Sequence, residues 1–62
     1  MRKLTLVIDE MASAFDPDPR EEVARILRMT ASMIQMDRLK GPLHDREGNK
    51  VGSYQLEFSP EP

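Results

Sequence analysis

One stretch of the sequence has the periodicity of a helix, and it lies between two stretches that alternate as strands do. It opens with Asp18-Pro19-Arg20-Glu21, which combines a capping Asp, a proline suited to the first helical position and an acid three residues after the cap. A stop signal follows at Gly41-Pro42. The sequence therefore predicts a helix over about residues 19–39, with one apolar stripe that is interrupted only by Thr30 and Asp37 and consists of Val23, Ile26, Leu27, Met33 and Ile34.

The flanking stretches have the alternation of half-buried strands. Leu4, Leu6 and Ile8 recur at every second position, which predicts a strand over residues 2–9. The loop that follows is expected to be anchored by Phe15. After the helix, Asp45 and Gly48 are spaced as in a type I turn closed by a glycine bulge, so a hairpin is expected there. In its second strand the residues expected to face the helix are Tyr54, Leu56 and Phe58.

The order strand, helix, strand, strand defines the fold class. It predicts a two-layer α+β domain of β-α-β-β type, in which one helix packs on one face of a three-stranded sheet. The last strand is expected in the centre, antiparallel to both others, because this order keeps the crossover right-handed. With 62 residues in all, we expect a single domain over residues 1–58 and a flexible tail over the proline-containing residues 59–62.

Composition excludes several classes of protein. The absence of cysteine excludes disulfides, iron–sulfur clusters, cysteine-ligated zinc and thiol nucleophiles. The longest apolar run, Leu6-Val7-Ile8, is far too short to span a bilayer. A net charge of −2 provides no attraction to nucleic acid or anionic lipid. We therefore expect a soluble, cytoplasmic protein that contacts neither membrane nor nucleic acid directly.

Few residues could perform catalysis or hold a metal. His44 is the only histidine, and its neighbour Asp45 is expected to hydrogen-bond the backbone of the turn. Adjacent strand residues point to opposite faces, so the two cannot act as a base and its orienting partner. The acidic stretch Asp16-Pro17-Asp18-Pro19 lacks the central glycine of a calcium-binding loop. No cofactor loop or nucleophile can be assembled, so we expect a non-enzymatic protein without metal or cofactor.

Acidic residues are concentrated before and at the start of the predicted helix. Residues 9–22 contain six acids and one base, Arg20. These acids either offset the positive end of the helix dipole or form a patch for a basic partner. In the second interpretation the contact residues are Asp16, Asp18 and Glu22.

Methionines widen the apolar side of the predicted helix. Met29 and Met36 lie beside Met33, beyond the arc that a three-stranded sheet can cover. Either the loop that carries Met11 and Phe15 folds over them, or Met29 and Met36 belong to a contact surface. The short chain favours association, so a homodimer is expected.

Three blocks of the sequence together resemble a group of short proteins encoded in bacteriophages and prophages: Ala14-Phe15-Asp16, the helical block over residues 19–28 and the hairpin block over residues 41–52. The resemblance carries no functional residues, and the methionines depart from the more charged helices of that group. It implies a stoichiometric accessory protein in the cytoplasm of a bacterial host, similar to anti-CRISPR and other counter-defence inhibitors.

Three hypotheses for function remain open. The leading one is an inhibitor that covers a basic, nucleic-acid-binding surface of a host protein through its acidic residues, with Met29 and Met36 as apolar contacts. An alternative is an oligomeric sponge for a nucleotide signal, in which Arg25 or Arg28 holds the phosphates. Arg25 is also placed to form an ion pair with Glu21 or Glu22 on the helix surface. The third hypothesis is a structural or regulatory adaptor of a mobile element.

Overall fold

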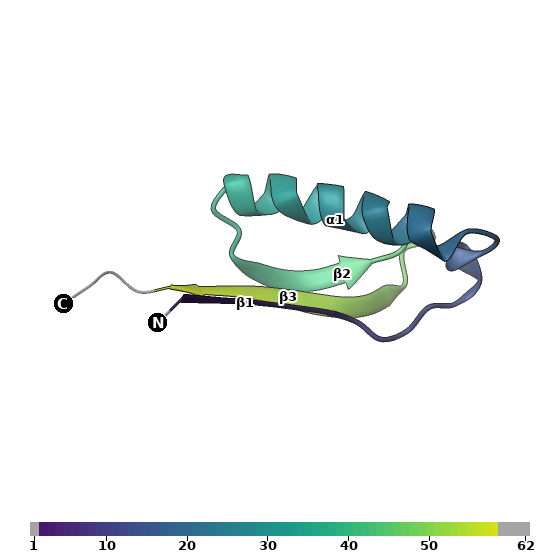
Figure 1. The fold of residues 1–62 in the computed structure, drawn as a ribbon, viewed down its shortest axis with the longest axis horizontal. Helices are drawn as coiled ribbons and strands as arrows, with labels where there is room; N and C mark the ends of the chain where they lie inside the picture. Colours follow the sequence, from purple (N-terminus) through teal and green to yellow (C-terminus); the bar gives the residue numbers. More distant parts are fainter. Residues whose placement is uncertain (1, 59–62) are drawn as a thin grey trace.

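A single helix lies on one face of a three-stranded antiparallel sheet (Figure 1). The computed structural model describes residues 2–58, and the tail predicted over residues 59–62 lies outside them. The elements are β1 (Arg2–Ile8), a short 3₁₀ helix η1 (Ser13–Phe15), α1 (Pro19–Gln35), β2 (Lys40–His44) and β3 (Lys50–Phe58). The strand order is β1-β3-β2, which confirms the predicted α+β fold with its last strand in the centre.

The sheet register confirms which side chains face the helix. Leu6 of β1 lies opposite Tyr54 of β3, and Leu4 lies opposite Leu56, so the alternating apolar residues of both strands share one face. Tyr54 is buried and Leu56 is half-buried. Phe58 stays 54% exposed, because β1 and β3 extend beyond the end of α1 (Figure 1).

The predicted end of the helix is wrong by four residues. α1 ends at Gln35, and Asp37 takes the left-handed conformation with φ 67°. The Asp37 N–H donates to Ile34 O at 3.0 Å and the Arg38 N–H donates to Met33 O at 2.9 Å, which is the bond pair of a Schellman motif. Aspartate visits this conformation more readily than most residues, so it takes the place that the sequence assigned to glycine. Gly41 and Pro42 lie instead in β2, where proline is tolerated because β2 is an edge strand.

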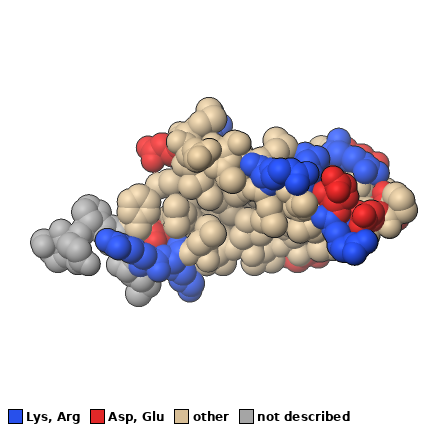
Figure 2. Space-filling view, turned by 45° about the horizontal axis from the view of Figure 1, so that its top comes forward, with Lys and Arg blue, Asp and Glu red and all other residues tan. Residues whose placement is uncertain are grey.

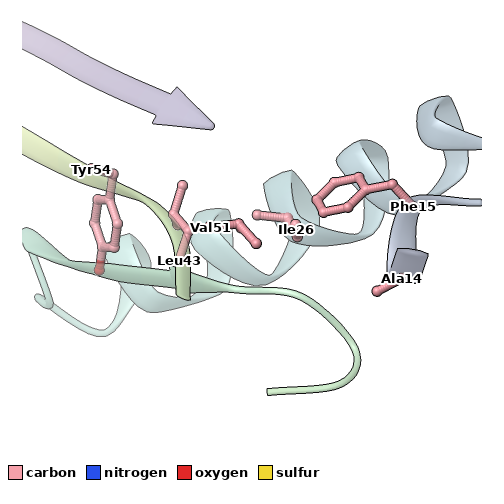
Figure 3. Close-up of a cluster of buried hydrophobic side chains, with 6 residues drawn as sticks. All are labelled: Ala14, Phe15, Ile26, Leu43, Val51 and Tyr54. Atoms are coloured by element: carbon pink, nitrogen blue, oxygen red, sulfur yellow. The ribbon is translucent and has the colours of Figure 1, made fainter. Parts of the chain in front are cut away.

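The core is a short row of side chains between α1 and the sheet (Figure 3). Phe15 is only 2% exposed, which confirms it as the anchor of the first loop. A register shift between Leu43 and His44 leaves Val51 without a partner in β2 and allows it to enter the core. The Tyr54 hydroxyl donates to Arg38 O at 2.7 Å and joins the sheet to the residues just after α1. The buried apolar residues are Ala14, Phe15, Ile26, Leu43, Val51 and Tyr54.

The helix does not cover the three strands equally. α1 packs most closely against β2 and η1, whereas β1 lies furthest from it (Figure 1). Leu4 of β1 and Leu27 of α1 are consequently 56% and 45% exposed. Within residues 2–58 no helix has the length and hydropathy needed to cross a bilayer.

Candidate interaction surface

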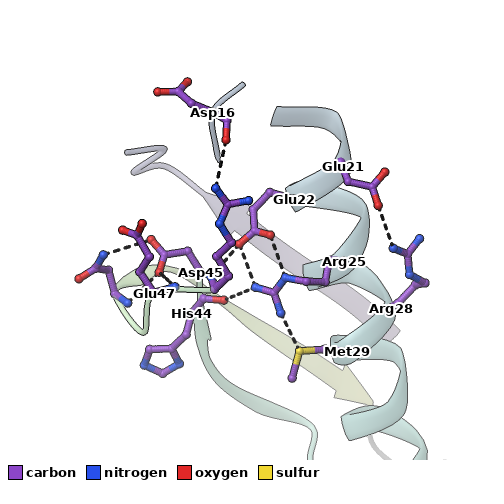
Figure 4. Close-up of polar contacts among 11 residues, drawn as sticks. Asp16, Glu21, Glu22, Arg25, Arg28, Met29, His44, Asp45 and Glu47 are labelled. Carbon is purple, nitrogen blue, oxygen red and sulfur yellow. Dashed lines mark hydrogen bonds and ion pairs between the residues drawn. The ribbon is translucent and has the colours of Figure 1, made fainter. Parts of the chain in front are cut away.

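A buried carboxylate ties the first half of α1 to the turn between β2 and β3 (Figure 4). Glu22 accepts hydrogen bonds from Arg25 Nε at 2.8 Å, from Arg25 Nη2 at 2.9 Å and from the Arg46 backbone N–H at 2.8 Å. The bonds from Arg25 lower the pKa of Glu22 to about 2, although burial opposes this shift. Arg25 also donates from Nη2 to His44 O at 3.4 Å. Glu22, Arg25 and the backbone of His44 and Arg46 therefore form a polar clamp between α1 and the hairpin.

The clamp separates Glu22 from the two acids with which the sequence grouped it. Glu22 is 4% exposed and its carboxylate already accepts three hydrogen bonds, so it is not part of an exposed acidic surface. The predicted ion pair of Arg25 is confirmed with Glu22 as its partner. The sequence could not show this burial, because the third donor, Arg46, lies 24 residues away in the chain.

A second buried carboxylate shapes the hairpin turn. Asp45 Oδ1 accepts from the backbone N–H groups of Glu47 and Asn49, each at 2.9 Å. Gly48 has φ 87° and donates its N–H to Asp45 O, as predicted for a type I turn with a glycine bulge. Burial alone would raise the pKa of Asp45, but the hydrogen bonds from Asn49 and Glu47 outweigh it and leave the pKa below its usual range.

His44 is exposed beside this turn. As predicted, the Asp45 carboxylate accepts hydrogen bonds from the turn residues Glu47 and Asn49. Asp45 therefore does not orient His44 as a catalytic base.

The interior polar groups have structural partners. Among residues 2–58 every buried side-chain nitrogen and oxygen has a hydrogen-bond partner. The same residues contain no group of three or more histidines and acids placed to hold a metal ion. The buried polar side chains of the clamp and the turn thus already have hydrogen-bond partners within the chain. The groups left for intermolecular contact are those on the surface.

The acidic stretch of the sequence does not form a separate negative patch. Asp18 caps α1 by accepting the Arg20 N–H at 3.1 Å, and its Oδ1 also lies 3.3 Å from Arg20 Nε. Arg46 reaches across to donate to Asp16 O at 3.1 Å. Acidic and basic side chains therefore mix at the end of the molecule where α1 begins, at the right of Figure 2. Asp16 and Asp18 stay exposed there, among bases.

The exposed part of α1 is rich in methionine, and we call Met29, Met33 and Met36 the methionine flank. Met29 is 53% exposed and Met36 is 67% exposed, whereas Met33 is half-buried. The prediction that Met29 and Met36 lie beyond the surface that the sheet covers is thus confirmed.

The proposed cover for the methionine flank is not present. Phe15 packs in the core, and Met11 lies on the opposite side of α1, beside an apolar hollow of about 490 Å³ that Val23 and Leu27 also line. The alternative in which the first loop folds over the methionines is therefore wrong.

An arginine borders the methionine flank. Arg25 Nη1 lies 3.0 Å from the sulfur of Met29. Arg28, on the same helix, has its side chain 67% exposed and pairs weakly with Glu21 at 3.7 Å. A smaller apolar hollow of about 120 Å³ lies between Met29, Met33 and β2. The surface combines adaptable thioethers with the Arg25 guanidinium, and both residue types are enriched at protein interfaces.

The geometry does not favour the nucleotide alternative. The Arg25 guanidinium is committed to Glu22, and Arg28 faces Glu21. An open hollow of about 730 Å³ lies on the face of the sheet that points away from α1, and neither arginine lines it. The two residues chosen as phosphate ligands therefore do not converge on a common cavity.

Comparisons with known proteins identify no relative. No family model matches the sequence, and no curated protein or solved structure matches it significantly.

Proposed function

We propose that this chain is a non-enzymatic binding protein that covers a surface of a host protein through its methionine flank. The proposal rests on one observation: Met29 and Met36 are more than half exposed, while the described interior leaves no polar side chain without a partner. Exposed apolar side chains gathered on one helix face favour protein contact, and flexible thioethers adapt to an irregular partner.

The charges around the methionine flank support the same function. Arg25 lies against Met29, and Asp16 and Asp18 are exposed at the end of the molecule where α1 begins. An apolar centre with a polar rim is the usual anatomy of an interface. Asp16 and Asp18 would contact Lys and Arg side chains of the target protein. Glu22 would contribute indirectly by holding Arg25 in position.

The resemblance to short bacteriophage and prophage proteins favours an inhibitory role within this class. A chain of this size would act sterically, by occupying a basic surface that the host protein uses to bind nucleic acid. Counter-defence inhibition of the anti-CRISPR type is the corresponding biological function.

The test compares Met29→Ser/Met36→Ser with the matched control Met11→Ser. Met11 is 54% exposed but lies on the other side of α1, so its substitution removes one exposed methionine away from the methionine flank. Each tagged protein would be used to capture partners from a bacterial lysate, and a captured host protein would then be purified and titrated. Burial of two half-exposed methionines contributes about 1 kcal/mol each, so the double variant is expected to bind at least tenfold more weakly.

The control should keep the wild-type affinity, and the wild-type protein should displace nucleic acid from the purified partner. Equal affinity of the double variant and the control would show that the methionine flank is not the contact surface. Saturable uptake of a cyclic nucleotide in calorimetry, without a protein partner, would favour the sponge hypothesis instead.

A further inference from the structure

The two edges of the sheet differ in how well they are protected against pairing with another strand. β2 has only five residues, contains Pro42 and has a register shift next to Leu43. β1 has seven residues that pair with β3 without a shift, and it contains neither proline nor a charge between Leu4 and Ile8. Edge strands of monomers are usually blunted by prolines, bulges or central charges. Only the β2 edge has such features.

Within residues 2–58, β1 is an edge strand whose outer side pairs with no other strand. The Asp9 N–H donates to Val51 O at 3.0 Å, so Asp9 points its backbone groups toward β3. Backbone direction alternates along an antiparallel ladder, and the even-numbered residues Leu4, Leu6 and Ile8 therefore turn their amides and carbonyls to the outer edge. Another extended strand can satisfy all of them.

The sequence around β1 is complementary to itself in the antiparallel direction. Arg2 and Lys3 precede the apolar centre, and Asp9 and Glu10 follow it. When two copies pair antiparallel about Leu6, Lys3 lies opposite Asp9 of the second copy, and Arg2 lies opposite Glu10. Opposite charges across strands stabilise pairing and like charges oppose it. Parallel pairing in the same register would place each charged residue next to the identical residue of the second copy, so that like charges repel.

The surface above the β1 edge is apolar and uncovered. Leu4 is 56% exposed on the helix-facing side of β1, and Leu27 is 45% exposed on the side of α1 that faces away from the methionine flank. Residues directly opposite each other in an antiparallel pair lie on the same face of the sheet. Antiparallel pairing of β1 therefore places both helices on one face and directs the exposed leucines of both copies toward the junction.

We propose that two copies of this chain dimerise by antiparallel pairing of their β1 strands about Leu6, forming a continuous six-stranded sheet. Strand β2, next to the methionine flank, then lies at each outer edge of this sheet. The flank stays available to another partner. The dimer interface and the proposed target surface are thus separate, and either can be disproved without the other.

Charge reversal tests both the surface and its direction. Arg2→Glu/Lys3→Glu makes both ends of β1 acidic, and Asp9→Lys/Glu10→Lys makes both ends basic. Each variant places like charges opposite one another in its own homodimer. Four exposed pairs each change from attraction to repulsion, so dimerisation is expected to weaken about a hundredfold. An equimolar mixture of the two variants restores every opposite-charge pair and is expected to form a heterodimer.

The readout is solution mass by light scattering over a dilution series, with circular dichroism to confirm that each variant is folded. Lys40→Glu/Lys50→Glu makes the same charge change as the first variant, on the β2 side of the sheet, and is expected to stay dimeric. A monomeric wild-type protein at all concentrations would overturn the proposal. So would dimers of either reversed variant as tight as the wild type, or two folded monomeric variants that fail to associate when mixed.

Discussion

Replacing Glu22 with glutamine tests whether the polar clamp stabilises the fold. The substitution keeps the shape of the side chain but removes the negative charge that accepts two hydrogen bonds from Arg25, at 2.8 and 2.9 Å. The glutamine oxygen can still accept two of the three hydrogen bonds, but the new amide group is a donor and faces the remaining donor. Arg25 also loses its counter-charge.

The expected cost follows from the burial of the pair. Breaking a fully buried ion pair costs about 3–5 kcal/mol. The Glu22 side chain is 4% exposed, but the Arg25 side chain is 33% exposed, so water partly replaces the lost partner. We therefore expect the free energy of unfolding to fall by about 2 kcal/mol. For a chain of this size that corresponds to a decrease in melting temperature of roughly 8–16 °C.

Glu21→Gln is the matched control, since it removes the same charge one residue away. The Glu21 side chain is 77% exposed and lies 3.7 Å from Arg28, so its loss should change stability by less than about 0.5 kcal/mol. Both variants would be unfolded with urea and followed by circular dichroism at equal protein concentration. Equal stabilities of the two variants would refute the argument that Glu22 is a buried clamp.

The same variant predicts a pH dependence. The pKa of Glu22 is lowered from 4.5 to about 2 in the folded protein, so folding favours its charged form. The stabilisation is complete above the ordinary pKa and is lost as the pH falls from about 4.5 toward 2. Because Glu22→Gln cannot titrate, its deficit relative to the wild type should shrink over this range. A deficit that stays constant down to pH 2 would contradict the assignment.

Three further substitutions test the backbone description, each by urea unfolding. Gly52→Ala should prevent normal pairing of β1 with β3, because the added Cβ would collide with the Val7 carbonyl oxygen; near-wild-type stability would contradict that register. Asp37→Gly should stabilise by about 0.5–1 kcal/mol, since glycine adopts the observed φ of 67° without strain, and a loss would show that the Asp37 side chain is needed. Tyr54→Phe should cost about 1 kcal/mol by removing the bond to Arg38 O, and no change would mean that water replaces it.

Local sequence signals determined the elements and their order. Asp18 and Pro19 start α1 because capping involves groups only two residues apart. Asp45 and Gly48 specify the hairpin turn for the same reason. The alternation in β1 and β3 assigned the helix-facing residues correctly, since side-chain direction in a strand depends only on position parity. The excess of methionine on one helix face was also visible, because helical spacing is regular.

Tertiary structure decided the properties that join distant parts of the chain. It ended α1 at Asp37, before the glycine and proline that local signals favoured, and placed these two residues in an edge strand. It buried Glu22 by bringing Arg46 to it, and it mixed bases into a stretch that is acidic in sequence. It also placed α1 nearest β2, leaving the β1 side uncovered. Each outcome depends on contacts between residues far apart in the chain, and capping and periodicity, which act within a few residues, contain no information about them.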